Sequence, residues 1–383
     1  MSGIYFHIPF CKQACHYCNF HFSTSLIFKD EMIAAMQKEI ILTKSNLIDN
    51  EVAGTNSDDG VSTIYFGGGT PSLLNVVEIE KLLETVNAAY HVSADAEITL
   101  EANPDDINEN KLSQWKEAGI NRLSIGVQSF NQKDLQWMNR AHNSGQALQC
   151  ITMVQKVGFT DYSVDLIYGT PTLEDDEWKK NVDIITTLKV PHVSCYALTV
   201  EPETALQKMI EQKKKNDIDP EKQATHFSML TSWMEAAGYE HYEISNFALP
   251  GHRSRHNSSY WHGEPYIGIG PSAHSYFGNI RRWNINNNAL YIKSLKNNII
   301  PFEQEELTAI QQLNEYIMIS LRTMEGLDLD FIKQKFGEEK SSRLKRESAK
   351  FKKAQKLKAI NQKLILTQEG KLFADGIAAE LFF

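Results

Sequence analysis

The chain has 383 residues, 42% of them hydrophobic, and a formal net charge of −9. A chain of this size can bury one large core and a smaller one, so we expect a main domain with an appendage. The acidic balance argues against nucleic-acid binding by the whole surface. No stretch approaches the ~18 consecutive apolar residues of a membrane span, and the N-terminus shows no charged segment or cleavage site, so we expect a soluble, cytoplasmic protein.

Short runs rich in β-branched and aromatic residues recur along the first half, each followed by a longer amphipathic segment. The predicted strands are 4–10, 61–69, 97–104, 122–130, 162–169 and 192–200. The predicted helices are 29–43, 76–90, 108–118, 132–140, 144–157 and 174–188, and the polar stretch 56–60 is expected to be a surface loop. Such units form parallel sheets, and six are too few to close an eight-stranded barrel. We therefore predict an α/β fold, an open, partial (β/α)6 barrel.

The domain organisation is expected to change after the sixth unit. Residues 1–203 are assigned to the barrel. Residues 204–303 are expected to be a linker and site-lining region, because 239–283 is rich in Gly, His, Asn, Tyr and Trp with little periodicity. Helices return in 304–383, where the final segment is typical of a hairpin followed by a terminal helix. We predict a mostly helical, winged-helix-like domain there.

A basic segment lies inside this last domain. Residues 333–358 hold eleven Lys or Arg against three Asp or Glu. A solvated helix face explains such a run, and a nucleic-acid-binding module is the alternative. The acidic chain and the lack of interleaved aromatic residues weigh against that alternative, so we expect no nucleic-acid partner.

Three of the five cysteines cluster in "FCKQACHYCNFHF", as Cys11, Cys15 and Cys18. The C-x3-C-x2-C spacing directly after the first predicted strand brings three sulfurs within reach of one metal centre. A structural zinc site prefers four ligands, and no second cysteine pair follows. An iron–sulfur cluster fits better, because three thiolates leave one iron open to an outside ligand.

Together with this loop, the motifs "GGGTPS", "EANP", "GVQSF", "DLIYGTP", "YALTVEP", "HNSSYW" and "GIGPSAHSY" resemble the radical S-adenosylmethionine (SAM) superfamily. Within it, the chain resembles the oxygen-independent coproporphyrinogen III oxidases and their related heme chaperones, over its whole length. The resemblance implies a [4Fe–4S] cluster on the three cysteines, SAM on the open iron, and an electron donor that triggers formation of a 5′-deoxyadenosyl radical.

The resemblance also implies a set of SAM-binding positions. They are Tyr5, Tyr17, Gly68, Gly69, Thr70, Glu101, Gln128, Arg140, Asp165, Ala197 and His274. Several have an ordinary structural alternative. Glu101 and Asp165 could cap strand ends, Tyr5 could be a buried strand residue, and the glycines could form a plain turn. Arg140 could hold a carboxylate of SAM or of a porphyrin in a bidentate fork, or be a surface helix residue.

Three features separate the chain from the oxidases of the family. Phe20 stands where they carry a fourth cysteine, Cys11 lies too near the start for their N-terminal extension, and "HNSSYW" is a signature of the chaperone branch. His256 in that motif is a candidate heme ligand and Tyr260 offers a flat face; a hydrogen-bonding loop anchor is the alternative for His256. His274 is a second candidate ligand.

These features predict a protein that binds heme and passes it to acceptor proteins. We expect the acceptors to be respiratory proteins at the inner face of the membrane, with which this protein associates peripherally. The alternative is an enzyme that decarboxylates coproporphyrinogen III with the same cluster.

Overall fold

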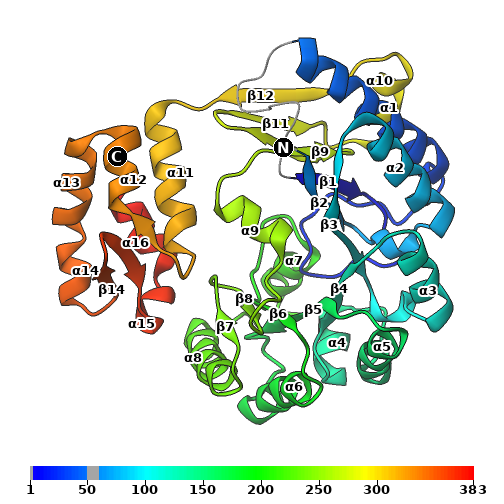
Figure 1. The fold of residues 1–383 in the computed structure, drawn as a ribbon. Coiled ribbons are helices and arrows are strands. Elements are labelled where there is room, and N and C mark those ends of the chain that lie inside the picture. The colour runs from blue at the N-terminus through cyan, green and yellow to red at the C-terminus, as the bar shows by residue number, and fades with distance from the viewer. Residues whose placement is uncertain (1–2, 50–59) are drawn as a thin grey trace.

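The structure is a computed structural model that describes residues 3–49 and 60–383. Its centre is six strands that pair in chain order, each parallel to the next. They are β1 (Gly3–Ile8), β2 (Val61–Gly68), β3 (Val92–Ala102), β4 (Arg122–Gln128), β5 (Asp161–Tyr168) and β6 (His192–Ala197). All six predicted strands are confirmed (Figure 1). The predicted loop 56–60 lies, apart from its last residue, outside the described residues.

Helices connect these strands as the amphipathic segments predict. They are α1 (Lys29–Asp49), α2 (Val76–Ala89), α3 (Glu109–Glu117), α4 (Gln132–Met138), α5 (Ser144–Val157) and α6 (Asp175–Thr187), with short 3-10 turns η1 (Pro71–Leu73) and η2 (Pro104–Asp106). Two of these helices begin with a capping box. Asn75 and Glu78 form it in α2, and Asn143 and Gln146 form it in α5.

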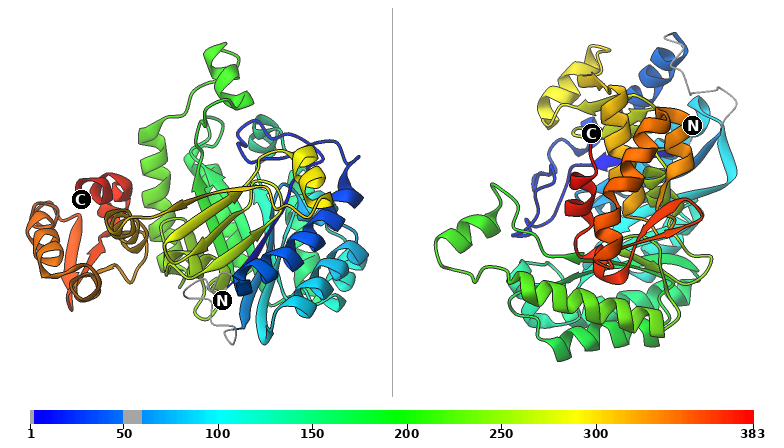
Figure 2. Two further views of the ribbon diagram at one scale, coloured as in Figure 1. Left: turned by 90° about the horizontal axis from the view of Figure 1, so that it is seen from above. Right: turned by 90° about the vertical axis from the view of Figure 1, so that its left-hand side faces the viewer.

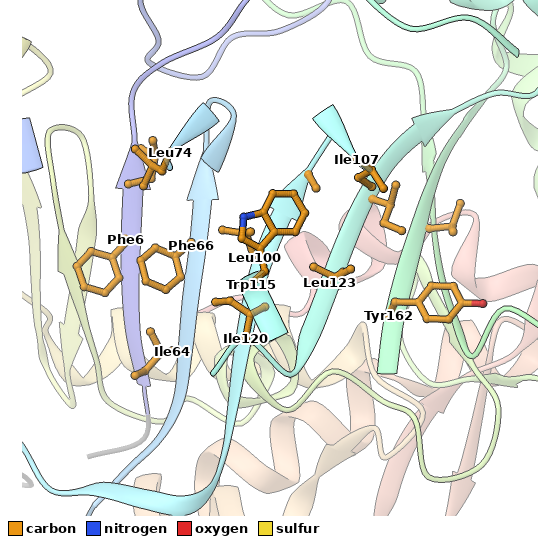
Figure 3. Packing of buried hydrophobic residues seen from close by; sticks show 14 of the residues in the cluster. Phe6, Ile64, Phe66, Leu74, Leu100, Ile107, Trp115, Ile120, Leu123 and Tyr162 are labelled. Atoms are coloured by element: carbon orange, nitrogen blue, oxygen red, sulfur yellow. The ribbon is translucent and has the colours of Figure 1, made fainter. Parts of the chain in front are cut away.

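The main core lies between the sheet and these helices. Alternate residues of neighbouring strands point into it, as Phe6 and Phe66 do with stacked rings 4.7 Å apart. Leu100 and Leu123 continue the same layer, and Trp115 of α3 packs over it (Figure 3). Because side chains alternate along a strand, the residues between these ones face the inside of the open barrel.

Both edges of the sheet are extended by strands from the region that we expected to be irregular. The strand β9 (Tyr266–Ile269) pairs in parallel with β1, and β10 (His274–Phe277), β11 (Ile280–Asn284) and β12 (Phe302–Glu306) follow antiparallel. At the other edge lie β8 (Asn246–Ala248) and β7 (Glu240–His241). The expectation that 239–283 has little regular structure is thus wrong, because the segment contains several strands of the sheet. Across the described residues the sheet runs from β12 to β7 without closing, as the partial-barrel prediction requires.

Four further helices accompany these strands: α7 (Ala205–Glu211), α8 (Pro220–Ala236), α9 (Arg255–Trp261) and α10 (Asn288–Lys296). The motif "HNSSYW" therefore lies on a helix, which begins at the capping residue Ser254, and not in a loop. Within the described ranges, no helix is long and apolar enough to cross a membrane.

The C-terminal unit has a hydrophobic core of its own, and Figures 1 and 2 show it to one side of the sheet. A three-stranded sheet in the order β13-β15-β14 packs with its helices, which agrees with the winged-helix-like prediction. Its elements are α11 (Ala309–Leu321), β13 (Leu327–Asp328), α12 (Leu329–Phe336), α13 (Glu338–Glu347), α14 (Ala349–Lys353), β14 (Leu357–Ile360), β15 (Lys363–Leu366), α15 (Gln368–Lys371) and α16 (Ala374–Glu380).

Candidate functional site

The cysteine loop leaves the carboxyl end of β1 and is fastened at two places. At its base, the backbone N–H of Cys11 donates to the carbonyl of Ser23 at 3.0 Å, which closes the loop. At its far side, the backbone N–H of His16 donates to the carbonyl of Met138 at 3.2 Å, at the end of α4. The loop is thus held over the strand ends, where ligands of parallel α/β sheets bind.

The three thiols are unpaired and half-buried. Burial raises the pKa of Cys11 to about 11, although a hydrogen bond with Thr70 opposes the shift, and burial raises the pKa of Cys18 as well. In the described ranges, no three His, Cys, Asp or Glu side chains are grouped so as to hold one metal ion. In a cluster each thiolate binds a different iron, so convergence on one point is not needed. The donor set, three thiols beside the half-buried Arg140 cation, fits such a cluster.

Arg140 is half-buried beneath this loop. One terminal nitrogen lies 3.2 Å from Cys15 Sγ and 3.5 Å from the Tyr17 hydroxyl. The other donates to Asn103 Oδ1 at 2.7 Å and to the Gly126 carbonyl at 2.9 Å. Arg140 is therefore not an ordinary surface residue. Protein groups contact both terminal nitrogens of its fork, so a bidentate contact with a carboxylate, one of the two roles considered for Arg140, would need some of these partners to move.

Asn103 extends the same network to the glycine loop, because its Nδ2 lies 3.3 Å from Thr70 Oγ1. Thr70 in turn bonds Cys11. Asn103 was absent from the predicted site, although its motif "EANP" was recognised. Its place two residues after Glu101, at a strand end, was the signal that could have identified it.

The glycines after β2 are required by the fold itself. Gly68 has φ +102°, and a Cβ there would lie 2.7 Å from the His7 ring. At Gly69 a Cβ would lie 2.6 Å from the Phe10 carbonyl, and its backbone N–H donates to Ile8. The close approach of this turn to β1 thus accounts for both glycines without a ligand.

Two carboxylates meet inside the barrel. Tyr65 donates to Glu101 Oε1 at 2.8 Å, and Ser124 lies 3.4 Å from Asp165 Oδ2. Burial raises the pKa of Glu101 to about 8, with a further rise from Asp165, and burial raises that of Asp165 to about 6. Among the described residues, the buried Oδ1 of Asp165 has no hydrogen-bond partner. Two half-buried carboxylates, one of them with an unpartnered oxygen, suit a cationic or hydroxyl-rich ligand.

The remaining predicted SAM positions lie at strand ends or on inward faces. Gln128 ends β4 with φ +66°, a strained conformation for a residue other than glycine, and Ala197 ends β6. Tyr5 faces inward from β1, where its hydroxyl lies 3.4 Å from His7 Nδ1. The structure brings these residues to one end of the sheet, and their contacts with SAM stay a prediction.

His256 is enclosed by protein. It is 1% exposed, its Nδ1 lies 2.8 Å from Thr63 Oγ1, and its Nε2 lies 2.8 Å from the Tyr260 hydroxyl. Its ring also stacks on Tyr65, and burial lowers its pKa to about 3. An iron ligand needs a free nitrogen. The structure therefore argues against His256 as the heme ligand, and its contacts match the anchoring alternative.

Tyr260 is also engaged, because besides its bond to His256 its ring packs edge-on against Tyr266 with centroids 4.6 Å apart. The second candidate, His274, is exposed on β10 instead. The residues that enclose His256, among them Thr63 and Glu97, were missed by sequence reasoning, because nothing in their surroundings in the chain marks them.

Comparisons with known proteins agree with this arrangement. A family model described as "Radical SAM superfamily" matches residues 5–185, and one described as "HemN C-terminal domain" matches 307–373. The heme chaperone HemW of Bacillus subtilis is 35% identical over 88% of this chain and 87% of its own length. HemW of Mycobacterium tuberculosis H37Rv is 33% identical over 99% of this chain and 94% of its own.

The solved structure of coproporphyrinogen III oxidase (HemN) from Escherichia coli superposes with a TM-score of 0.84, covering 100% of this chain and 90% of that one at 22% identity. That likeness shows the fold. An open (β/α)6 barrel with a C-x3-C-x2-C loop after its first strand is the arrangement of a radical SAM protein. The chain belongs to the radical SAM superfamily and, within it, to the heme chaperone HemW branch of the coproporphyrinogen oxidase-like family.

Proposed function

We propose that this protein is a heme chaperone, which binds a [4Fe–4S] cluster, SAM and heme and passes the heme to acceptor proteins. The observation that carries the proposal is the loop of three unpaired, half-buried thiols, with the exposed side chain of Phe20 at the position of a fourth. The curated relatives are named as heme chaperones, which supports the same cargo. The proposal also includes an electron donor, respiratory acceptor proteins, peripheral contact with the membrane and a cytoplasmic location.

Cys11, Cys15 and Cys18 would hold the cluster, and with SAM it supplies one-electron chemistry. The protein's own residues orient and shield this centre. Arg140 bonds Cys15 and sets a cation against the thiols, which favours their thiolate form. Glu101, whose pKa is raised to about 8 by burial, would gain a partner from an ammonium group placed beside it.

The test compares two substrates on the same anaerobically reconstituted protein. We expect incubation with heme to give a stable heme absorbance, and incubation with coproporphyrinogen III, SAM and a reductant to give no protoporphyrinogen IX. Cys15→Ser serves as the cluster-free control. Sustained formation of protoporphyrinogen IX with matching SAM cleavage, absent in that control, would establish the oxidase instead.

A further inference from the structure

The inner face of the sheet extension carries a row of aromatic residues. On β9 and β10, the buried Ile267, Ile269 and Phe277 pack in the main core. The alternate residues face the inside of the barrel, and there Tyr276 pairs across the strands with Tyr266, while His274 pairs with Trp283. The rings of His274 and Trp283 lie 6.3 Å apart.

His274 lies at the ligand-binding end of the sheet. It starts β10 directly after the turn that follows β9, and β9 runs parallel to β1. The carboxyl ends of β1 and β9 therefore share one edge, from which the cysteine loop departs. His7 of β1 lies at the same edge, where its Nε2 is 2.9 Å from the carbonyl oxygen of His21 in the cysteine loop.

The turn before His274 is held from below by a buried carboxylate. Glu39 of α1 accepts hydrogen bonds from the Gly270 N–H at 2.8 Å and from Asn284 Nδ2 at 2.6 Å. The Asn284 N–H donates to the Ala273 carbonyl at 2.9 Å, next to His274. The backbone that presents His274 is thus fixed before any ligand arrives.

The chemistry of this edge suits an iron porphyrin. His274 is exposed, and in the part of the chain that the structure describes its ring nitrogens have no hydrogen bond. Burial of part of the ring and the nearby Arg281 cation lower its pKa, which favours the neutral imidazole that binds heme iron. Trp283 is half-buried beside it and offers a flat aromatic surface.

We propose that His274 is the axial ligand of the heme iron and that Trp283 forms a wall against which the macrocycle packs. This inference rests on the proposed heme-binding function and assigns its site to the strand-end edge rather than to α9. It also places the cargo beside the cysteine loop, because His274 and that loop lie at the same edge of the sheet.

The experiment is a heme titration of the full chain with its reconstituted cluster, followed by absorbance. We expect His274→Ala to weaken heme binding at least tenfold and to shift the heme spectrum, with added imidazole restoring it. Trp283→Leu should weaken binding without changing the ligand-sensitive bands. The matched control is His262→Ala, an exposed histidine at the end of α9, which should leave both unchanged.

The outcomes separate this inference from the proposed function. If the wild type binds no heme, the function itself fails. If the wild type binds heme and His274→Ala binds it equally, or loses only SAM binding in calorimetry, the site assignment is overturned while the function stands. If His274→Ala does not hold its cluster, the variant His274→Met tests the assignment instead. A thioether ligand should keep the heme bound but change its absorbance spectrum. An unchanged spectrum would overturn the assignment.

Discussion

His256 on α9 and His274 on β10 lie close in the sequence but in opposite surroundings. His256 is 1% exposed, and each ring nitrogen already has a hydrogen-bond partner. His274 is exposed at the end of the sheet from which the cysteine loop departs. The difference teaches that a recognisable motif does not by itself make its histidine available, because the fold uses both ring nitrogens of His256 and, among the residues that the structure describes, leaves those of His274 open.

The same contrast extends to the surroundings of each histidine. Around His256 lies what we call the α9 anchor, formed with Glu97 and Tyr260. Glu97 accepts from the backbone N–H groups of Arg255 and His256, both at 2.9 Å, and so satisfies the start of the helix. At the strand ends lie half-buried thiols and half-buried carboxylates instead. Substitutions in the α9 anchor should therefore lower the stability of the fold, and substitutions at the strand ends should weaken the binding of ligands.

The largest expected effect is at the strand ends. Cys15→Ser should abolish the [4Fe–4S] cluster, because only three clustered thiolates are present, yet it should change the free energy of unfolding of the cluster-free protein by about 1 kcal/mol or less. Iron analysis, electron paramagnetic resonance and urea unfolding measure the two quantities.

The control for this prediction is Cys150→Ser on α5, a buried thiol remote from the loop. It should keep the cluster. An intact four-iron cluster in Cys15→Ser would refute the ligand set, and loss of the cluster in the control would show it to be incomplete.

The second effect is at the anchor. His256→Ala should lower the free energy of unfolding by about 2–4 kcal/mol, because it leaves a cavity and removes one hydrogen bond each from Thr63 and Tyr260. Heme affinity should stay within about twofold of the wild type once the variant is folded. Urea unfolding measures the stability and heme titration measures the affinity. His262→Ala is the matched control, and its free energy of unfolding should stay within about 0.5 kcal/mol of the wild type. A folded His256→Ala that has lost heme would return the ligand to α9.

The parallel strands and the thiols could be predicted because their signals are local. Each central strand is six residues or longer and is followed by an amphipathic helix, and the cysteine loop is defined by spacing alone. The strands β7–β11 have between two and five residues and gain their place by pairing with the central sheet. Such short runs carry no periodicity of their own.

The enclosure of His256 could not be predicted for a different reason. Its partner Thr63 lies 193 positions away in the chain, and Glu97 lies 159 away. Only the folded sheet brings β2, β3 and α9 together, so the motif indicates a family but not the contacts of its histidine. Arg140 illustrates the same point, because its burial against Cys15 spans 125 positions.

The smallest predicted effect concerns pH and has opposite signs in the two regions. The pKa of Glu101 is raised to about 8 from the ordinary 4.5, so between these values the folded state holds a proton that the unfolded state has lost. The contribution of Glu101 to the free energy of unfolding should therefore fall as pH rises through this window and level off above pH 8. For His256, whose pKa is lowered to about 3 from 6.5, the contribution should fall instead as pH drops below 6.5.

Urea unfolding of the cluster-free protein at several pH values measures these contributions, as the difference between wild type and variant. Between pH 6 and 8, we expect Glu101→Gln to remove about 2 kcal/mol of the decline in stability. Asp165→Asn serves for comparison: its own window ends near pH 6, and because burial is the main cause of the Glu101 shift, most of the decline should remain in this variant. If the stabilities of Glu101→Gln and the wild type decline in parallel from pH 6 to 8, Glu101 is already ionised in the folded protein. The contrast between a protonated carboxyl group at the strand ends and a neutral histidine enclosed by protein would then be lost.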